Sequence, residues 1–519
     1  MILTWNFLHL KLVDLRQTYT STEKDLLERM EEKQGEAVAV INMKTYYFII
    51  LILATINTVS AQTDSTSITK ANTYKKRVLE STEVDLLMSY YEQDGTHSAV
   101  NGGIGTEELN DITPTIIITT PIDEDDVLTI DAGISAYTSA SSSDVNPFVT
   151  GASTFDFNNS VRPKGTPWQA SSGASGKDIW GGITTSYEHS NDQRTQKWNA
   201  SASFSKEYDY TSFGIGAGYS WSLFEKNTDI NVNAKAFFDK WNAIYPTELE
   251  EFGIYGSNFQ NEGYFENVAI WDSNGLQTNS YNPTRFNFSN NELRNTYLFS
   301  TSISQILSKS LKASVFADIS YQEGLLSTPF QRVYFSDIED YYIGNPVFIS
   351  QYRTPNNTEV FHLADDNERL PHSRLKTPLG IRTNYYVNEW LVLKGYYRFY
   401  WDNWGLSSHT LSIDAPIKLN LGKYAIIPSM RYYKQSEIEY FAPYNQHLST
   451  SEFYTSDYDL SDFMSTQYSL GIRYTDIFTK VKIAHFGLKT VNIRYSLYSR
   501  SDGLKANIAS ASLKFISDR

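Results

Sequence analysis

Alternation of apolar and polar residues over ten or more positions most constrains the fold of this chain. In the segment TDINVNAKAFFDKW, Ile230, Val232 and Phe238 share one face, whereas Asn231 and Asp239 share the other. A period of two indicates β-strands. Such segments exceed the length of about five or six residues that is usual in soluble proteins. They match the tilted strands of about ten residues that cross a bilayer.

About sixteen segments of this kind are predicted, at 84–91, 112–120, 127–138, 178–189, 196–210, 212–223, 229–242, 293–307, 311–323, 374–387, 390–402, 407–420, 424–441, 466–475, 490–500 and 504–516. The connections after odd-numbered segments include all the long ones, which are 92–111, 139–177, 243–292, 324–373 and 442–465. Those after even-numbered segments are mostly short, except for 476–489. Sorting of connections by parity is typical of outer-membrane barrels. We therefore expect an all-β fold, a transmembrane antiparallel β-barrel with long extracellular loops, over residues 81–519.

Composition agrees with a barrel and excludes several other classes of protein. Aromatic residues make up 14% of the chain although the mean hydropathy is only −0.39, so apolar residues are spread through alternating segments. After Ala61 no stretch reaches the length of a transmembrane helix, and only helices and closed barrels satisfy their backbone groups in lipid. A propeller is the competing all-β fold, but no repeat of blade length is visible. The absence of cysteine excludes disulfides and thiolate metal sites, and a net charge of −15 argues against nucleic acid as a partner.

The stretch MKTYYFIILILATINTVSAQT, which begins at Met43, has the order of a secretory signal peptide. Lys44 gives a positive start, an apolar run follows, and Val59-Ser60-Ala61 forms a small-residue end. We expect residues 43–61 to be a cleaved signal peptide that exports the protein to the outer membrane. Residues 1–42 are interpreted as a disordered upstream extension outside the mature protein, and residues 62–80 as a periplasmic N-terminal segment.

The block from Arg77 to Phe148, which begins RVLESTEVDLLMSYYEQDGTHSAVNGGIG, resembles the start of a bacterial family of unknown function, domain-of-unknown-function family 3570. The pieces SGASGKDIW (172–180) and DKWNAIYPTEL (239–249) are similar to the same family. The resemblance implies an exported outer-membrane barrel of Gram-negative bacteria without an established activity. It also implies outer-membrane lipid and the barrel-assembly machinery as partners, with periplasmic lipoproteins or thioredoxin-like proteins as further partners.

Charged residues on the polar faces of the strands are the candidate pore lining. The basic ones fall on later segments and are Arg382, Lys394, Arg398, Lys418, Arg431, Arg473 and Arg494, whereas the acidic ones fall on earlier segments and are Asp131, Glu188, Glu207 and Asp239. Opposed charged walls in a wet pore would orient polar solutes and set ion selectivity. The competing interpretation is that these residues pair with each other and fill the lumen. If they line a pore, replacing Arg398, Arg431 and Arg473 with serine is expected to reduce anion preference, measured as reversal potential.

Three further clusters are candidate chemical sites. The run Asp123 to Asp126 and the set His362, Asp365, Asp366, Glu368 and His372 have ligand chemistry but lack metal-site spacing, so we predict polar loops and no metal. Ser407 and His409 share a strand face without an evident acidic partner, so no catalytic site, no enzyme activity and no cofactor are predicted.

These features favour a porin-like passive channel for small polar solutes, narrowed by loops 243–292 and 324–373. The alternative is a plugged barrel that acts as a binding or assembly scaffold for periplasmic or surface partners. An outer-membrane enzyme is the weakest hypothesis.

Overall fold

The computed structural model describes residues 77–139, 178–207, 209–266, 268–283, 286–287, 292–352 and 359–517. The interpretations of residues 1–42 and 43–61 therefore lie outside the described residues. Nearly all of the connection 139–177 and most of the segment 62–80 also lie outside them. Among the described residues, no helix is both long and apolar enough to cross a membrane.

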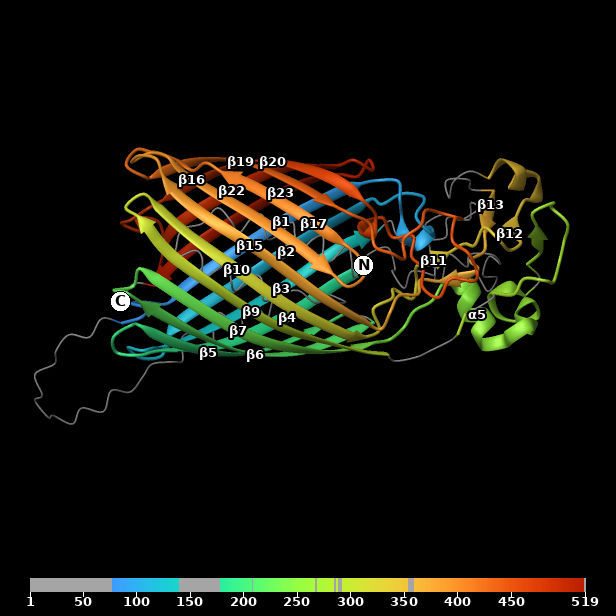
Figure 1. The fold of residues 1–519 in the computed structure, drawn as a ribbon, viewed down its shortest axis with the longest axis horizontal. Helices are drawn as coiled ribbons and strands as arrows, with labels where there is room; N and C mark the ends of the chain where they lie inside the picture. Colours follow the sequence, from blue (N-terminus) through green and yellow to red (C-terminus); the bar gives the residue numbers. More distant parts are fainter. Residues whose placement is uncertain are drawn as a thin grey trace, which may run out of the picture.

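The barrel is a closed antiparallel sheet of sixteen strands, as predicted (Figure 1). The strands are β1 (Glu83–Asp94), β2 (Leu109–Pro121), β3 (Asp126–Ser139), β4 (Asp178–Ser190), β5 (Gln196–Lys206), β6 (Tyr210–Leu223), β7 (Thr228–Trp241), β9 (Glu292–Ser308), β10 (Leu311–Gly324), β15 (Ser373–Tyr386), β16 (Val392–Asp402), β17 (Ser407–Asp414) continued by β18 (Ile417–Leu419), β19 (Tyr424–Gln435), β20 (Phe463–Thr475), β22 (Phe486–Arg500) and β23 (Lys505–Ser517). Each strand pairs with its neighbours in the chain, and β1 pairs with β23 to close the sheet. At this seam Lys514 Nζ lies 2.6 Å from Glu83 Oε2 and 3.7 Å from Asp85 Oδ2.

Alternation places apolar side chains outside the barrel and polar side chains inside it. On β10, Val315 and Ile319 are both 51% exposed, whereas the intervening Phe316, an aromatic exception on the inward face, is 8% exposed. On β22, Ile493 and Leu497 are exposed and Arg494 and Ser496 are buried. An apolar outer band with a polar interior is the arrangement of a transmembrane barrel, because the outer face meets hydrocarbon.

Several predicted strand boundaries differ from the observed ones, as three segments illustrate. The segment 407–420 is divided between β17 and β18 at Pro416, which has no backbone N–H to donate to the sheet. The segment 424–441 ends as a strand at Gln435, and Ile438 packs instead into a cluster with Leu326 and Leu370 outside the barrel sheet. The segment 196–210 ends at Lys206, so a tight turn joins β5 to β6.

The long connections fold into a separate layer beyond one end of the barrel, which we call the cap (Figure 1). It is built from the described residues of connections 95–108, 242–291, 325–372 and 436–462. It contains α5 (Thr247–Tyr255), β8 (Ile270–Asp272), β11 (Arg332–Val333), β12 (Tyr341–Gly344), β13 (Val360–His362) and β14 (Asp366–Asn367), with short 3-10 turns η2 (Ala99–Asn101), η3 (Gly256–Asn261), η4 (Gly263–Phe265), η5 (Pro346–Gln351) and η6 (Tyr458–Leu460). Strands β8, β12 and β13 form one small sheet, and β11 pairs with β14. The opposite end of the barrel carries the short turns, which we call the turn end.

Candidate pore and its external cap

The residues predicted to line a pore lie on the inward faces of the barrel strands, with one exception. Their positions are β3 for Asp131, β4 for Glu188, β7 for Asp239, β15 for Arg382, β16 for Lys394 and Arg398, β18 for Lys418, β19 for Arg431, β20 for Arg473 and β22 for Arg494. Glu207 is the exception, because it begins the turn after β5. Its carboxylate is nevertheless buried and accepts a hydrogen bond from the Tyr137 hydroxyl.

Two of the acidic residues have basic partners on the same side of the barrel. Asp239 lies 2.9 Å from Arg294 of β9 and accepts a hydrogen bond from the Ser212 hydroxyl at 2.8 Å. Glu188 lies 2.8 Å from Lys197 of β5. The acidic wall is therefore partly neutralised locally rather than by the basic wall opposite.

The basic side has its own local partners. Arg494 Nη2 lies 3.9 Å from Asp414 Oδ1, and Arg473 donates to the Asn492 side chain at 2.8 Å. Arg382 lies over the ring of Phe316, with its guanidinium carbon 4.5 Å from the ring centroid. Whether these side chains line an open path stays a prediction.

Small inward side chains differ in exposure between the two sides of the barrel. On β5 and β6 the inward positions include Asn199, Ser201, Ser203, Gly216 and Gly218, which are all partly exposed. The inward polar residues Thr410, Gln467 and Ser496 on β17, β20 and β22 are only 2%, 2% and 1% exposed. Long side chains such as Arg431 and Tyr498 are buried on the same inward faces. These positions on β5 and β6 are therefore less buried than the compared positions on β17, β20 and β22.

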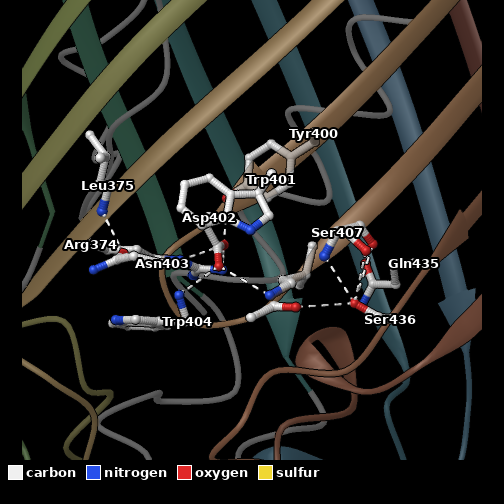
Figure 2. A network of polar contacts seen from close by, with 12 residues as sticks. Arg374, Leu375, Tyr400, Trp401, Asp402, Asn403, Trp404, Ser407, Gln435 and Ser436 are labelled. Carbon is white, nitrogen blue, oxygen red and sulfur yellow. Dashed lines mark hydrogen bonds and ion pairs between the residues drawn. The ribbon is translucent and has the colours of Figure 1, made fainter.

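A polar network fixes the tight turn between β16 and β17 at the cap end of the barrel (Figure 2). Asp402 is fully buried and accepts hydrogen bonds from Arg374 Nε at 2.9 Å and from Arg374 Nη2 at 2.5 Å. The Tyr400 hydroxyl and the backbone N–H groups of Trp404 and Leu406 also donate to this carboxylate. The guanidinium of Arg374 in turn lies 4.2 Å from the Trp404 ring centroid. Arg374 was missed by sequence reasoning, although alternation along β15 places it on the inward face.

A buried ion pair joins three connections in the cap. Arg332 Nε donates to Glu248 Oε1 at 2.7 Å and Arg332 Nη2 to Glu248 Oε2 at 3.2 Å, and both side chains are completely buried. Arg332 Nη1 also donates to the carbonyl of Val100 at 3.2 Å. Because these residues come from connections 325–372, 242–291 and 95–108, the pair ties these connections together. Sequence reasoning missed both charges, although Pro246 followed by Glu248 and Glu250 is a recognisable start of a helix.

His362, one of the metal candidates, is enclosed by tyrosines. Its ring stacks between Tyr334 and Tyr342, with centroids 4.3 and 4.7 Å away. Nδ1 lies 2.6 Å from the Tyr444 hydroxyl, and Nε2 lies 3.4 Å from Asp340 Oδ1. Nδ1 thus has a hydrogen-bond partner within the cap, and Nε2 has a carboxylate within ion-pair distance.

The other metal candidates contact different parts of the protein. Asp365 accepts from the Phe335 N–H and Asp366 from the Tyr454 hydroxyl, while His372 Nδ1 lies 3.1 Å from the Gly324 carbonyl. The carboxylate of Asp123 accepts from the N–H groups of Asp125 and Asp126 in a turn. Within the described part of the chain, no three such groups gather around a point that would hold a metal ion.

The residues of the weak catalytic hypothesis have separate partners. Ser407 Oγ lies 3.3 Å from Ser436 Oγ, whereas His409 Nδ1 lies 2.8 Å from the Tyr397 hydroxyl on the outer face. That the protein is not an enzyme stays a prediction.

Several carboxyl groups of the cap have raised pKa values because they are buried. Burial raises the pKa of Glu368 to about 8, and the charge of Asp457 adds to the shift. Burial likewise raises the pKa of Asp457 to about 6 and that of Glu107 to about 7. A carboxyl whose pKa is higher in the folded state favours folding below its unfolded pKa and loses that contribution as pH rises to the folded value.

The cap is therefore expected to open more readily at pH 8 than at pH 5. The measurement is amide hydrogen exchange of residues 360–368 at both pH values, corrected for the intrinsic rate. Glu368→Gln should protect these amides at pH 8 and flatten the dependence, because a neutral amide can still bond the Thr455 hydroxyl and the Thr328 N–H. Equal protection of the unmodified protein at the two pH values would contradict the expectation.

Solved outer-membrane proteins share the barrel architecture with this chain at low identity. A structure described as a bacterial polysaccharide outer membrane secretin has a TM-score of 0.39 and 8% identity, covering 84% of this chain and 98% of that one. A mutant of the ferric enterobactin receptor PfeA from Pseudomonas aeruginosa has a TM-score of 0.36 and 11% identity, covering 82% of this chain and 54% of the receptor. The outer membrane protein opdK from Pseudomonas aeruginosa has a TM-score of 0.30 and 8% identity, covering 84% and 99%. Values this low carry no argument about what the barrel binds.

No curated protein matches the chain. The family model described as "Protein of unknown function (DUF3570)" matches residues 49–511, which include the cap and nearly all of the barrel. This confirms the resemblance noted in the block from Arg77 to Phe148. The chain thus belongs to the DUF3570 family of proteins of unknown function.

Proposed function

We propose that the protein is a passive outer-membrane channel for small polar solutes. Closed barrels of about sixteen strands are wide enough to leave an aqueous path between their walls. The observation that carries the proposal is the partly exposed wall of small side chains on β5 and β6, which includes Ser201 and Gly216. Solutes would pass along this wall, and the packed arginine side of the barrel would set the field across the path.

Conduction is the direct test of this proposal. The purified protein is expected to give stable single-channel currents in planar bilayers. Ser201→Trp, which adds a large side chain to the accessible wall, is expected to lower the conductance by about twofold or more, since conductance follows pore width. Ala202→Trp is the matched control, because its side chain lies on the outer face one residue along the same strand.

Two outcomes would contradict the channel. The first is the absence of any current at high protein density. The second is an equal effect of Ser201→Trp and Ala202→Trp, which would mean that the wall is not the conducting path.

The second candidate is a plugged barrel that serves as a scaffold for surface or periplasmic partners, including lipoproteins or thioredoxin-like proteins. The observation that favours it is the folded cap. The buried pair between Glu248 and Arg332 holds connections of the cap together, and a folded cap offers a fixed surface to a partner. A silent bilayer together with recovery of one defined partner after crosslinking would support the scaffold. For both candidates we propose export through the segment 43–61, which is tested by finding the protein in the outer-membrane fraction.

A further inference from the structure

The connection between β20 and β22 is built differently from the other turns at the turn end of the barrel. It contains β21 (Lys482–Ile483), which pairs with Phe486 and Gly487 at the start of β22. The backbone N–H of Leu488 also donates to the Val481 carbonyl at 2.7 Å. The connection is therefore an ordered hairpin, which we call the 476–489 hairpin.

Large apolar side chains of this hairpin are exposed. The exposed fractions are 76% for Ile477, 79% for Phe478, 54% for Val481 and 64% for Ile483. Four exposed apolar side chains on one short hairpin form a patch of the kind that marks an interaction surface. By contrast, the turn between β4 and β5 at the same end is polar, with the sequence NDQRT.

Lysine side chains accompany the apolar ones. Lys480, Lys482 and Lys489 lie on the hairpin, and Lys423 comes from the neighbouring turn. The two turns are joined, because the backbone N–H of Thr475 donates to the Lys423 carbonyl at 2.8 Å. The single carboxylate of the 476–489 hairpin, Asp476, accepts hydrogen bonds from the N–H groups of Phe478 and Lys480. A chain with a net charge of −15 thus presents a locally basic and apolar surface here.

This surface continues the lipid-facing band of the barrel. Tyr424 and Tyr474 lie just above it on β19 and β20, with ring centroids 5.5 Å apart. Lys423 Nζ lies 5.6 Å from the centroids of both rings. Tyrosines with a lysine reaching over them are typical of the depth at which hydrocarbon meets lipid headgroups. The hairpin lies beyond these tyrosines, at the turn end of the barrel.

We propose that the 476–489 hairpin, together with Lys423, docks on an anionic phospholipid surface at the turn end of the barrel. The exposed apolar side chains enter the interface between headgroups and acyl chains, while the lysines contact the anionic headgroups. The basic charge and the continuity with the lipid-facing band favour a lipid surface over a protein partner. This proposal requires that the barrel spans a bilayer but not that it conducts. The lipid-docking proposal and the channel proposal can therefore fail independently.

Because the chain has no cysteine, a single introduced cysteine gives a unique labelling position. Phe478→Cys carries an environment-sensitive fluorophore, and Gln193→Cys in the polar turn between β4 and β5 is the matched control. The labelled full chain is reconstituted into vesicles of phosphatidylcholine, with or without phosphatidylglycerol. Iodide reports exposure to water, and lipids with a quencher on the acyl chain report contact with the bilayer.

The label at position 478 is expected to be quenched by lipid and protected from iodide, more strongly with phosphatidylglycerol, while the label at 193 stays accessible to iodide. Adding Lys480→Gln and Lys482→Gln should lower the ratio of lipid-contacting to water-exposed label by about fivefold per lysine at low salt. Retained resistance of the barrel to detergent without heating verifies folding, and Ile483→Cys replaces Phe478→Cys if that variant does not fold. Equal iodide access at 478 and 193 in both vesicles would overturn the proposal and point to a protein partner. Unchanged quenching after removal of the lysines would overturn the role of anionic headgroups.

Discussion

Replacing Glu248 with alanine is expected to destabilise the cap by about 3–5 kcal/mol, because it leaves the guanidinium of Arg332 buried without its counter-charge. The pair has no exposed surface, so water cannot replace the lost carboxylate without opening the structure. Amide hydrogen exchange of residues 332–335 is the measurement. Opening should become more frequent by a factor of about one hundred or more.

Two controls isolate the buried charge as the cause. Glu250→Ala changes a carboxylate on the same helix that is only partly buried, and it is expected to cost about 0.5 kcal/mol or less. The double replacement Glu248→Leu with Arg332→Met removes both charges and is expected to be nearly neutral, since well-packed apolar residues often substitute for a buried pair. Unchanged exchange in Glu248→Ala would show that the pair does not hold the cap together.

Replacing Asp402 with alanine is expected to weaken the cap-end rim of the barrel by a similar amount, about 3–5 kcal/mol. Arg374 would lose the carboxylate oxygen that accepts from both its Nε and its Nη2. The N–H groups of Trp404 and Leu406 would lose the other oxygen, the acceptor that shapes the turn. The measurement is the temperature at which the folded barrel in detergent converts to the slower-migrating unfolded form on a gel.

Variants of the same turn separate the contributions of charge and backbone contacts. Asp402→Asn keeps an acceptor for the turn but removes the charge, so its effect should be intermediate. Asn403→Ala removes only the bond to the Leu375 N–H and is expected to cost about 0.5–1.5 kcal/mol. A conversion temperature for Asp402→Ala equal to that of Asn403→Ala would contradict the expectation for the buried pair.

The barrel was predictable from sequence because each strand carries its own alternating pattern of apolar and polar residues. A strand with one face in lipid and one in a polar interior repeats every second residue, so 229–242 and 311–323 were recognisable without knowing their neighbours. Errors occurred where another interaction replaced sheet pairing. Pro416 interrupts a barrel strand. Ile438 lies outside the sheet and packs against Leu326 and Leu370.

The cap was not predictable because its contacts join residues far apart in the chain. Arg332 and Glu248 are 84 positions apart, and no periodicity relates them. Alternation predicted the correct face of the strand for most of the inward charged residues. It did not predict that Arg294 pairs with Asp239 or that Lys197 pairs with Glu188. Those partners depend on side-chain reach between neighbouring strands, which alternation alone does not encode.

The pair of Arg332 with Glu248 and the Val100 carbonyl also limits how these proteins can be recombined. Surface loops of barrels usually tolerate exchange because each contacts little besides its own strands. Here three loops share one buried contact, so a single loop transplanted from a homologue would arrive without its complementary charge or carbonyl. Exchanging the connections 95–108, 242–291 and 325–372 as one unit preserves the contact, and chimeras built this way should assemble where single-loop chimeras do not.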